Sequence, residues 1–366
     1  MTDPTLPQAG MNKSPEPIRV LVVDDSAFMR FSISQHLNEK PELLVVGSAN
    51  DGKEAIRLIP LLSPDVITMD VEMPNMDGLT TLRHIMKNFP RPVIMFSSLT
   101  KDGTAETIQA LMLGAVDFIA KPDNRLDIRQ VMDEMAVKIL AAAKAKVKPT
   151  SLRLPTIQIP LQSPAGDKPV STYYKNSPVV FIGSSTGGPG ALNEIIPALS
   201  VNLQSPVVIV QHMPAGFTRS LSERLNAISP LKVKEAEVGD RLMVGQVLVA
   251  PGGFHMLFDE NERVTLNQKP TVHGVRPSVD VTLTSLVQRY GKSIVAVILT
   301  GMGSDGTNGS SLLHSEGGYV IAEHESTCVV WGMPRSVVEA GAANAVLPRQ
   351  QIARAIERAV RDFSSS

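Results

Sequence analysis

Three side chains in the second half of the chain could together cleave an acyl bond. Ser185 lies in Gly-Ser-Ser-Thr-Gly after an apolar run, His212 closes the apolar stretch Val-Val-Ile-Val-Gln-His, and Asp305 follows a third apolar run. A serine becomes a nucleophile when a base takes its proton, and that base needs a carboxylate to orient it. Because the carboxyl ends of parallel strands meet at one edge of a sheet, these positions predict a Ser–His–Asp arrangement.

Each of the three residues also has a plainer interpretation. A turn rich in Ser, Thr and Gly between a strand and a helix is typical of a tight corner, with Ser184 as a helix N-cap. His212 could be a structural residue at a strand end, and Asp305 could belong to an Asp-Gly turn or cap a helix. The order Ser, His, Asp differs from that of α/β-hydrolases, so the Gly-x-Ser-x-Gly pattern does not assign that family. The three residue types together favour nucleophilic chemistry.

Residues 301–306, Gly-Met-Gly-Ser-Asp-Gly, also match the Gly-x-Gly-x-x-Gly pattern of a dinucleotide site. Glu323 ends the next apparent strand, near the distance expected for a ribose-binding acid. Against this alternative, Asp305 puts a carboxylate where the pyrophosphate would lie, and the motif does not follow the first strand of a domain. Binding of NAD(P) is the observation that would favour it.

The first half of the chain gathers carboxylates at strand ends. Asp24 and Asp25 follow the first apolar run, Asp70 ends the third, Ser97 the fourth, and Lys121 follows the fifth. Carboxylates in one crevice repel each other, and Mg²⁺, which takes one or two carboxylates, waters and phosphate oxygens, relieves this repulsion. Asp70 could then attack a phosphoryl group, while Lys121 pairs with the new charge and Ser97 hydrogen-bonds it and repositions. The plainer interpretation is that the aspartates are turn and cap residues.

Alternating apolar runs and amphipathic segments position these residues. From residue 18 the pattern predicts parallel strands with helices on both faces of the sheet. The expected strands are 18–25, 43–49, 65–70, 92–98 and 116–120. The expected helices are near 29–39, 53–62, 79–88, 105–113 and 125–146. We therefore expect an α/β domain over residues 18–140.

A proline-rich stretch without periodicity, residues 141–177, predicts an extended linker. A second α/β domain is expected over 178–366, with strands at 179–185, 206–213, 293–301 and 319–325 and a last helix at 349–363. Residues 239–268 have short alternating runs broken by Gly, Asp, Glu and Asn, which predict antiparallel hairpins. The second sheet is therefore expected to be doubly wound and mostly parallel, with added hairpins.

The composition excludes several classes of function. The 35 Lys and Arg residues nearly balance 36 Asp and Glu, so no net field attracts nucleic acid or a membrane surface. A single cysteine, Cys328, excludes an intrachain disulfide and a Cys-rich zinc site, and its neighbours indicate a buried strand. No apolar run approaches the roughly 20 residues of a membrane span. Residues 1–17, polar and proline-rich, predict a disordered tail on a cytoplasmic protein.

Four stretches of the first half together resemble the receiver domain of response regulators, the family of the chemotaxis protein CheY. They are VLVVDDSAFMR, DVITMDVEMPNMDG, PVIMFSS and GAVDFIAKP. The resemblance implies that Asp70 is the phosphoacceptor, supplied by the phosphohistidine of a histidine kinase, with Ser97 and Lys121 as switch residues. The Mg²⁺ ligands that it implies are Asp25, Asp70, the Glu72 carbonyl and, in support, Asp24.

Six stretches of the second half resemble the protein-glutamate methylesterases of chemotaxis, the CheB family. They are IGSSTGGPGAL, VIVQHMPAGFT, VLVAPGGFHM, RPSVDVTLTSL, VILTGMGSDGTNG and CVVWGMPRSVVEAG. The resemblance implies hydrolysis of glutamate methyl esters on methyl-accepting chemotaxis receptors, with release of methanol, and extends to deamidation of receptor glutamines. Ser185 would be the nucleophile, His212 the base and Asp305 its partner, with the Met302 backbone N–H and the Ser185/Thr186 turn binding the oxyanion.

The same resemblance implies that the esterase reaction needs no cofactor and that the protein is a monomer. His255 and Arg276 lie in family-like segments and are candidates for the substrate groove, although a structural role in a hairpin also suits His255. The domain order implies that the unphosphorylated receiver covers the esterase cleft and that phosphorylation loosens this docking. The alternative is a binding module whose second domain is inactive.

Overall fold

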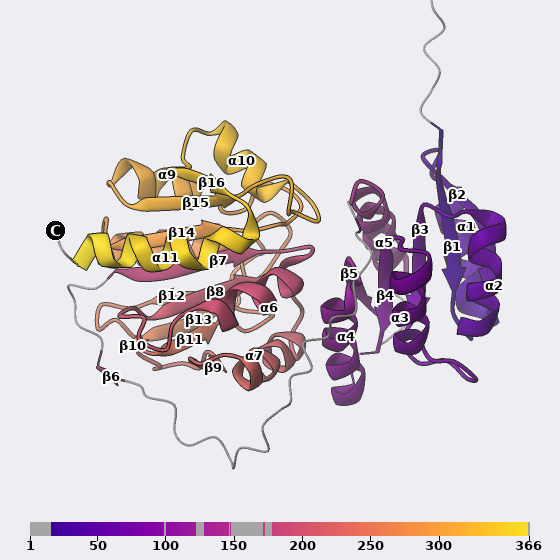
Figure 1. Ribbon diagram of the computed structural model, residues 1–366, viewed down its shortest axis with the longest axis horizontal. Helices are drawn as coiled ribbons and strands as arrows, with labels where there is room; N and C mark the ends of the chain where they lie inside the picture. Colours follow the sequence, from indigo (N-terminus) through magenta and orange to yellow (C-terminus); the bar gives the residue numbers. More distant parts are fainter. Residues whose placement is uncertain are drawn as a thin grey trace, which may run out of the picture.

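The structure is a computed structural model. It contains two parallel sheets, each between layers of helices, which form the two ends of the molecule (Figure 1). The structure describes residues 16–98, 100–121, 128–145, 147, 171–172 and 178–364. Nearly all of the expected tail (1–17) and most of the expected linker (141–177) lie outside the described residues, so these two expectations stay predictions.

The first sheet has five parallel strands in the order β2-β1-β3-β4-β5. The strands are β1 (Ile18–Val23), β2 (Leu43–Ala49), β3 (Val66–Asp70), β4 (Val93–Ser97) and β5 (Asp117–Ala120). The helices are α1 (Ala27–Asn38), α2 (Gly52–Leu62), α3 (Gly78–Asn88), α4 (Lys101–Leu113) and α5 (Ile128–Ala142). This arrangement confirms the α/β fold expected for the first half.

Side-chain caps fix where the helices of this sheet begin. Ser26, Asp51, Asp77 and Thr100 each accept a hydrogen bond from a backbone N–H in the first turn of the next helix. Such a cap satisfies a donor that has no partner within the helix. The strands β3 and β4 are buried along their whole length, so Asp70 and Ser97 at their ends belong to the packed interior of the sheet.

The second sheet has seven strands in the order β16-β15-β14-β7-β8-β11-β9, and every neighbouring pair is parallel. Its strands are β7 (Val179–Ser184), β8 (Val207–Gln211), β9 (Lys232–Glu235), β11 (Gln246–Val249), β14 (Ile294–Ile298), β15 (Tyr319–Glu323) and β16 (Ala345–Leu347). The strand order runs outward in opposite directions from the neighbouring strands β7 and β14. Open α/β sheets bind ligands at such a switch point.

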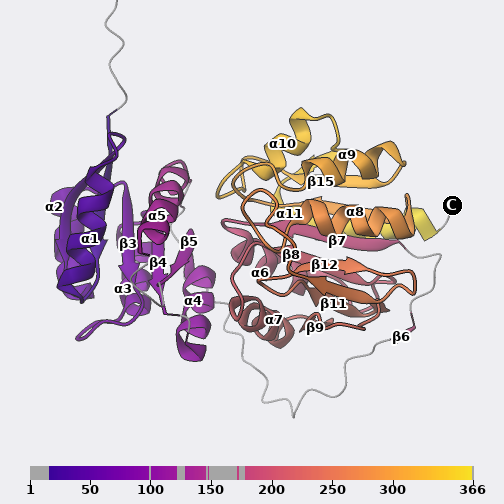
Figure 2. The ribbon, with the colours of Figure 1, turned by 180° about the vertical axis from the view of Figure 1, so that it is seen from behind.

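Helices cover both faces of the second sheet. They are α6 (Gly188–Ala198), α7 (Phe217–Ile228), α8 (Val279–Tyr290), α9 (Thr307–Ser315), α10 (Met333–Glu339) and α11 (Arg349–Ser364). In the view of Figure 1, α6, α7 and α11 lie in front of the sheet. In the opposite view of Figure 2, α8 and α9 lie in front of it. The doubly wound, mostly parallel fold is therefore confirmed.

The segment 239–268, expected to hold antiparallel hairpins, contains one parallel strand as well. Within it, β11 pairs in parallel with β8 and with β9 and extends the main sheet, which the expectation did not include. The hairpin of β12 (His255–Phe258) and β13 (Val264–Asn267) is antiparallel as expected. The strand β10 (Met243–Val244) pairs with β6 (Ser171–Thr172), which lies inside the expected linker. Short strands reached by distant crossovers resemble hairpins in sequence, because strand alternation does not encode the direction of the partner.

The two domains pack through α4 on one side and through α6 and α7 on the other (Figures 1 and 2). Phe118 of β5 stacks on Phe217 of α7, with 4.3 Å between ring centroids. A hydrogen bond of 3.1 Å joins the hydroxyls of Thr104 and Ser220. One apolar core therefore continues from the first domain into the second.

Cys328 is buried as expected, but it lies in a loop after β15 and not in a strand. Among the described residues, no helix is long and apolar enough to cross a membrane.

Candidate active site

Ser185 lies at the sharp corner between β7 and α6. Gly187, the N-cap of α6, has a φ of +77°, and a Cβ there would lie 2.6 Å from the Val329 side chain, so glycine is required on both counts. Ser184 is fully buried and its hydroxyl donates to Gln211 Oε1 at 2.6 Å. Ser184 therefore ends β7 and does not cap α6, whereas Ser185 is partly exposed.

The register of two parallel strands brings His212 beside this corner. Ser184 pairs with Gln211 across β7 and β8, and the His212 N–H donates to the Ser184 carbonyl at 3.1 Å. The Gln211 amide donates to the carbonyls of Ser185 (2.9 Å) and His212 (3.2 Å). Gln211 thus joins the corner that carries Ser185 to the strand end that carries His212, a role that its sequence position did not predict.

Asp305 reaches the same edge from the loop after β14. Its Oδ2 lies 2.8 Å from His212 Nε2 and accepts from the Val279 N–H at 2.7 Å. Its Oδ1 accepts from Ser278 Oγ and from the Asp280 N–H, both at 2.9 Å. The carboxylate therefore caps the start of α8, and not α9, which follows it in the chain and has Gly306 as N-cap.

These donors decide the charge of Asp305. Burial alone would raise the pKa of this carboxyl, but the His212 hydrogen bond and charge and the backbone N–H groups of α8 lower its pKa below the ordinary value. An ionised carboxylate is the form that stabilises an imidazolium.

His212 uses Nε2 toward Asp305, which leaves Nδ1 as the nitrogen that can take a proton from a serine. Within the described part of the chain, Ser185 Oγ and His212 do not hydrogen-bond. Such a contact commonly tightens only when substrate is bound.

Two unpaired backbone donors lie near Ser185. Neither the Met302 nor the Thr186 N–H hydrogen-bonds to another described residue. The Met302 loop packs closely against Ser185, because a Cβ on Gly301 would lie 2.8 Å from Ser185 Cβ. Free N–H groups at such a corner can stabilise an oxyanion.

The carboxylates of the first sheet also meet at the carboxyl ends of its strands. Oxygens of Asp24, Asp25 and Asp70 lie within 4.8 Å of one another. Asp24 Oδ2 is buried and has no hydrogen-bond partner. Burial and the charge of Asp70 raise the pKa of Asp24 to about 6. A cation would relieve both the repulsion and the orphaned oxygen.

Among the described residues, Asp70 pairs with one cationic side chain at this site. Lys121 Nζ lies 2.7 Å from Asp70 Oδ2. Burial raises the pKa of Asp70, although Lys121 and the Glu72 N–H act against that rise. The Ser97 hydroxyl points instead to the carbonyls of Ser98 (3.3 Å) and Gly103 (3.1 Å), so it contacts the start of α4 rather than Asp70.

Comparison with known proteins assigns both domains to families. Residues 180–356 match the family model described as CheB methylesterase, and residues 20–133 match the response regulator receiver domain. A protein of Symbiobacterium thermophilum named protein-glutamate methylesterase/protein-glutamine glutaminase is 51% identical over 352 residues, covering 94% of this chain and 97% of that protein. The chain belongs to the CheB methylesterase family. Relatives of the same name from Thermotoga maritima (47% identical, 92% of this chain, 96% of that protein) and Pyrococcus abyssi (45%, 94% and 94%) agree.

The structure argues against the alternative of a dinucleotide site at residues 301–306. Glu323 is fully buried and is held by the Thr300 N–H (2.8 Å) and by Arg349 (3.0 Å), so it cannot bind a ribose. Thr300 in turn donates to the Thr186 carbonyl at 2.9 Å and accepts the Ser185 N–H on its own carbonyl at 3.1 Å. Glu323 therefore supports the corner that carries Ser185 through its contact with Thr300.

The two other groove candidates of this CheB-family chain lie along the β12–β13 hairpin and the loop after it. His255 is buried and its Nε2 lies 3.0 Å from the Pro270 carbonyl. Arg276 donates to the carbonyls of Gln268 and Lys269, both at 2.8 Å. These contacts support a structural role for both residues.

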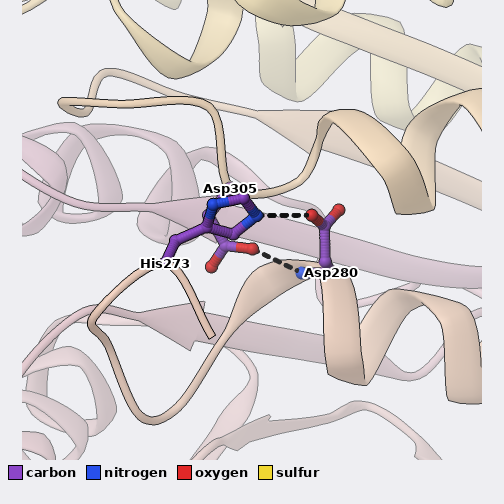
Figure 3. Close-up of side chains that lie close together, drawn as sticks. All are labelled: His273, Asp280 and Asp305. Carbon is purple, nitrogen blue, oxygen red and sulfur yellow. Dashed lines mark hydrogen bonds and ion pairs between the residues drawn. The ribbon is translucent and has the colours of Figure 1, made fainter. Parts of the chain in front are cut away.

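A second cluster, His273, Asp280 and Asp305, also has its ligand atoms within 4.8 Å (Figure 3). Each oxygen of Asp305 already accepts two hydrogen bonds, so this cluster is a poor cation site. Of these two clusters, only the receiver's has a buried carboxylate oxygen without a partner.

Proposed function

We propose that the chain hydrolyses glutamate γ-methyl esters on the cytoplasmic helices of chemotaxis receptors and releases methanol. The observation that carries the proposal is the strand register that puts Ser185 beside His212, whose Nε2 lies 2.8 Å from the Asp305 carboxylate. The names of the relatives supply the substrate class. An inactive second domain would have no need of an ionised, fully hydrogen-bonded Asp305.

In this mechanism Ser185 Oγ attacks the ester carbonyl while His212 Nδ1 takes the hydroxyl proton. Asp305 fixes the ring and stabilises the imidazolium, and the Met302 and Thr186 N–H groups bind the oxyanion. The imidazolium then gives its proton to the departing methoxide, which leaves as methanol. A water, deprotonated by His212, cleaves the acyl-enzyme and restores the glutamate and the free serine.

The same steps deamidate a glutamine when ammonia leaves in place of methanol. The relatives' names include protein-glutamine glutaminase, which supports this second reaction. It requires no further residue, because His212 protonates either leaving group.

We also propose that Asp70 is phosphorylated by a histidine kinase and that this activates the esterase. The pocket suits Mg²⁺ held by Asp25, Asp70 and the Glu72 carbonyl with Asp24 in support, since Asp24 carries an orphaned buried oxygen. When bound, Mg²⁺ neutralises charge on the transferred phosphoryl group. Lys121 orients the Asp70 carboxylate that attacks phosphorus.

The domain contact supports a route from Asp70 to the esterase. Lys121 directly follows β5, and at the other end of this short strand Asp117 accepts a hydrogen bond from Thr186, the neighbour of Ser185. Lys138 pairs with Asp117 at 3.4 Å. A shift of β5 when Lys121 turns to a phosphoryl group would therefore act on the nucleophile's corner.

The test of the catalytic proposal is methanol release from receptors methylated in membranes. The full-length chain is expected to release methanol. Absence of release in the presence of a phosphodonor, from receptors that another methylesterase demethylates, would contradict the proposal.

The test of activation uses Cys328, the single cysteine of the chain. It lines a cavity of about 360 Å³ between the domains, and burial raises the pKa of its thiol above the usual range. A small phosphodonor should increase both the esterase rate and the rate at which a thiol reagent labels Cys328. Equal rates of both reactions with and without the phosphodonor, in protein shown to be phosphorylated, would rule the mechanism out.

A further inference from the structure

A second His–Asp pair lies directly behind the catalytic one. His273 Nε2 lies 3.3 Å from Asp280 Oδ2 (Figure 3). Asp280 is buried, whereas the His273 side chain is 39% exposed. Asp280 is the second residue of α8. The first two backbone N–H groups of this helix, those of Val279 and Asp280, donate hydrogen bonds to the Asp305 carboxylate. The pair therefore contacts the carboxylate that orients His212.

The two aspartates cap each other's helices. Asp305 accepts the Asp280 N–H at the start of α8, while Asp280 Oδ1 accepts the Gly309 N–H at 2.8 Å in the first turn of α9. The N-cap of α9, Gly306, has no side chain to supply this acceptor, so Asp280 supplies it from another element.

Close packing makes this exchange rigid. A Cβ on Gly309 would lie 3.0 Å from Leu283 Cβ, so the first turn of α9 is in contact with the second turn of α8. Asp305 is two residues before the first residue of α9, so a displacement of the first turn of α9 would also displace Asp305. The contact of Asp280 with this turn is therefore coupled to the position of Asp305.

Asp280 also brings charge to the site. Three groups face it from the surrounding elements: His273 from the loop before α8, Asp305 from the loop before α9, and the Gly309 N–H from α9 itself. Burial and the charge of Asp305 raise the pKa of Asp280, while the Gly309 N–H and His273 act against the rise. Beyond Asp305 lies His212, whose protonated form a second negative charge favours.

We propose that Asp280 is a positioning residue for the esterase reaction: it locks Asp305 through Gly309, and its charge, partnered by His273, favours the proton on His212. The proposal rests on the proposed function for its kinetic effect. It assigns Asp280 no contact with substrate.

The experiment compares Asp280→Asn, which keeps an oxygen for Gly309 but removes the charge, with Asp280→Ala, which removes both. In Asp280→Asn the acid limb of the pH profile of kcat/KM should move to lower pH, because the imidazolium loses a stabilising charge. In Asp280→Ala kcat should also fall, by about 10- to 100-fold with KM unchanged, as for other residues that hold a catalytic group from behind. Asp51→Asn, which removes the charge from the cap of α2 in the receiver, is the matched control and should leave the profile unchanged.

An NMR titration of the His212 ring gives the same comparison without turnover. In Asp280→Asn the ring should titrate at lower pH than in wild type. This measurement does not depend on methanol release, so it tests the proposal even if the proposed function fails its own test. An unchanged ring titration in folded Asp280→Asn would overturn the proposal. So would an Asp280→Ala variant that raises KM and leaves kcat as in wild type. If Asp280→Ala does not fold, the Asp280→Asn titration alone decides.

Discussion

Each domain has a cluster of acidic side chains near the carboxyl ends of its parallel strands, and the two clusters differ in how their oxygens are hydrogen-bonded. In the esterase domain both oxygens of Asp305 accept two hydrogen bonds, and the pKa of the carboxyl is lowered although burial acts to raise it. In the receiver, Asp24 has a buried oxygen without a partner, and burial and Asp70 raise its pKa to about 6.

The difference indicates how one sheet architecture could serve the two chemistries proposed for this chain. A carboxylate fully satisfied by protein donors is fixed in place and ready to stabilise a developing positive charge. A buried carboxylate oxygen without a hydrogen-bond partner can instead be satisfied by a cation, or by a phosphoryl group together with its counterion. Hydrogen-bond partners, rather than the number of acidic residues, separate a preorganised site from a switch.

Removing the charge of the satisfied carboxylate should have the largest effect. We expect Asp305→Asn to lower kcat about 10⁴-fold, because His212 loses the group that fixes its tautomer and stabilises its protonated form. Methanol release at saturating receptor measures this. Asp362→Asn, on the exposed face of α11, is the control. A loss below tenfold in folded protein would mean that Asp305 is not the partner of the base.

The rigidity of the esterase site can be tested at Gly301. An added Cβ would lie 2.4 Å from Met333 Sδ and 2.8 Å from Ser185 Cβ. Gly301→Ala should therefore displace the nucleophile and lower kcat about 100-fold. Gly341→Ala, in a turn with a φ of +69°, should lower stability, but a Cβ there meets nothing within 4 Å and kcat of the folded variant should stay close to wild type. Equal kcat values for the two variants would show that the corner tolerates displacement.

The incomplete cluster should depend on a divalent cation and the complete one should not. Asp25→Asn is expected to slow phosphorylation of Asp70 by a small phosphodonor about 10- to 100-fold, since a ligand of Mg²⁺ is weakened. In wild type, EDTA should stop phosphorylation and leave basal methanol release unchanged. If EDTA abolished basal methanol release, the complete cluster would itself need a metal, which would break the comparison.

The smallest expected effect is on stability, and its sign differs between the clusters. The pKa of Asp24 is higher in the folded state than its ordinary value of 3.8, so its contribution to stability is lost as pH rises from about 4 to about 6. Asp24→Asn in EDTA should therefore stabilise the protein at pH 7 by about 1 kcal/mol, with no gain below pH 4.

Asp305 should show the reverse. The pKa of Asp305 is lower in the folded state than its ordinary value of 3.8. Its contribution to stability is therefore fully present at pH values above that ordinary pKa, and it is lost as the pH falls through the folded-state pKa. Asp305→Asn should therefore destabilise the protein at pH 7. Thermal unfolding at pH 4 and pH 7 measures both variants, and effects of the same sign at pH 7 would contradict the comparison.

Much of this architecture followed from the sequence. Alternating apolar runs predicted both parallel sheets, and the rule that strand ends share an edge predicted that Ser185, His212 and Asp305 come together. The structure brings the three residues to one edge, while their catalytic roles stay predictions. The Asp-Gly pattern at 305–306 indicated a cap, but it did not indicate that Asp305 would cap α8 in place of α9.

The rest could not be predicted because it depends on partners distant in sequence. Gln211 acquires a role only once β7 and β8 are in register, and Asp280 only once α8 and α9 touch. The contact of Asp117 with Thr186 requires the two domains to dock. No local pattern encodes such pairings, since each depends on where another element packs.

The two neighbouring serines offer the most direct test of the central claim. Ser184 and Ser185 differ in burial and in partner, so a matched pair of alanine variants separates the nucleophile from its structural neighbour. Methanol release from methylated receptor should fall by several orders of magnitude in Ser185→Ala and by less than about tenfold in Ser184→Ala. A folded Ser185→Ala variant that releases methanol at the wild-type rate would contradict the catalytic assignment.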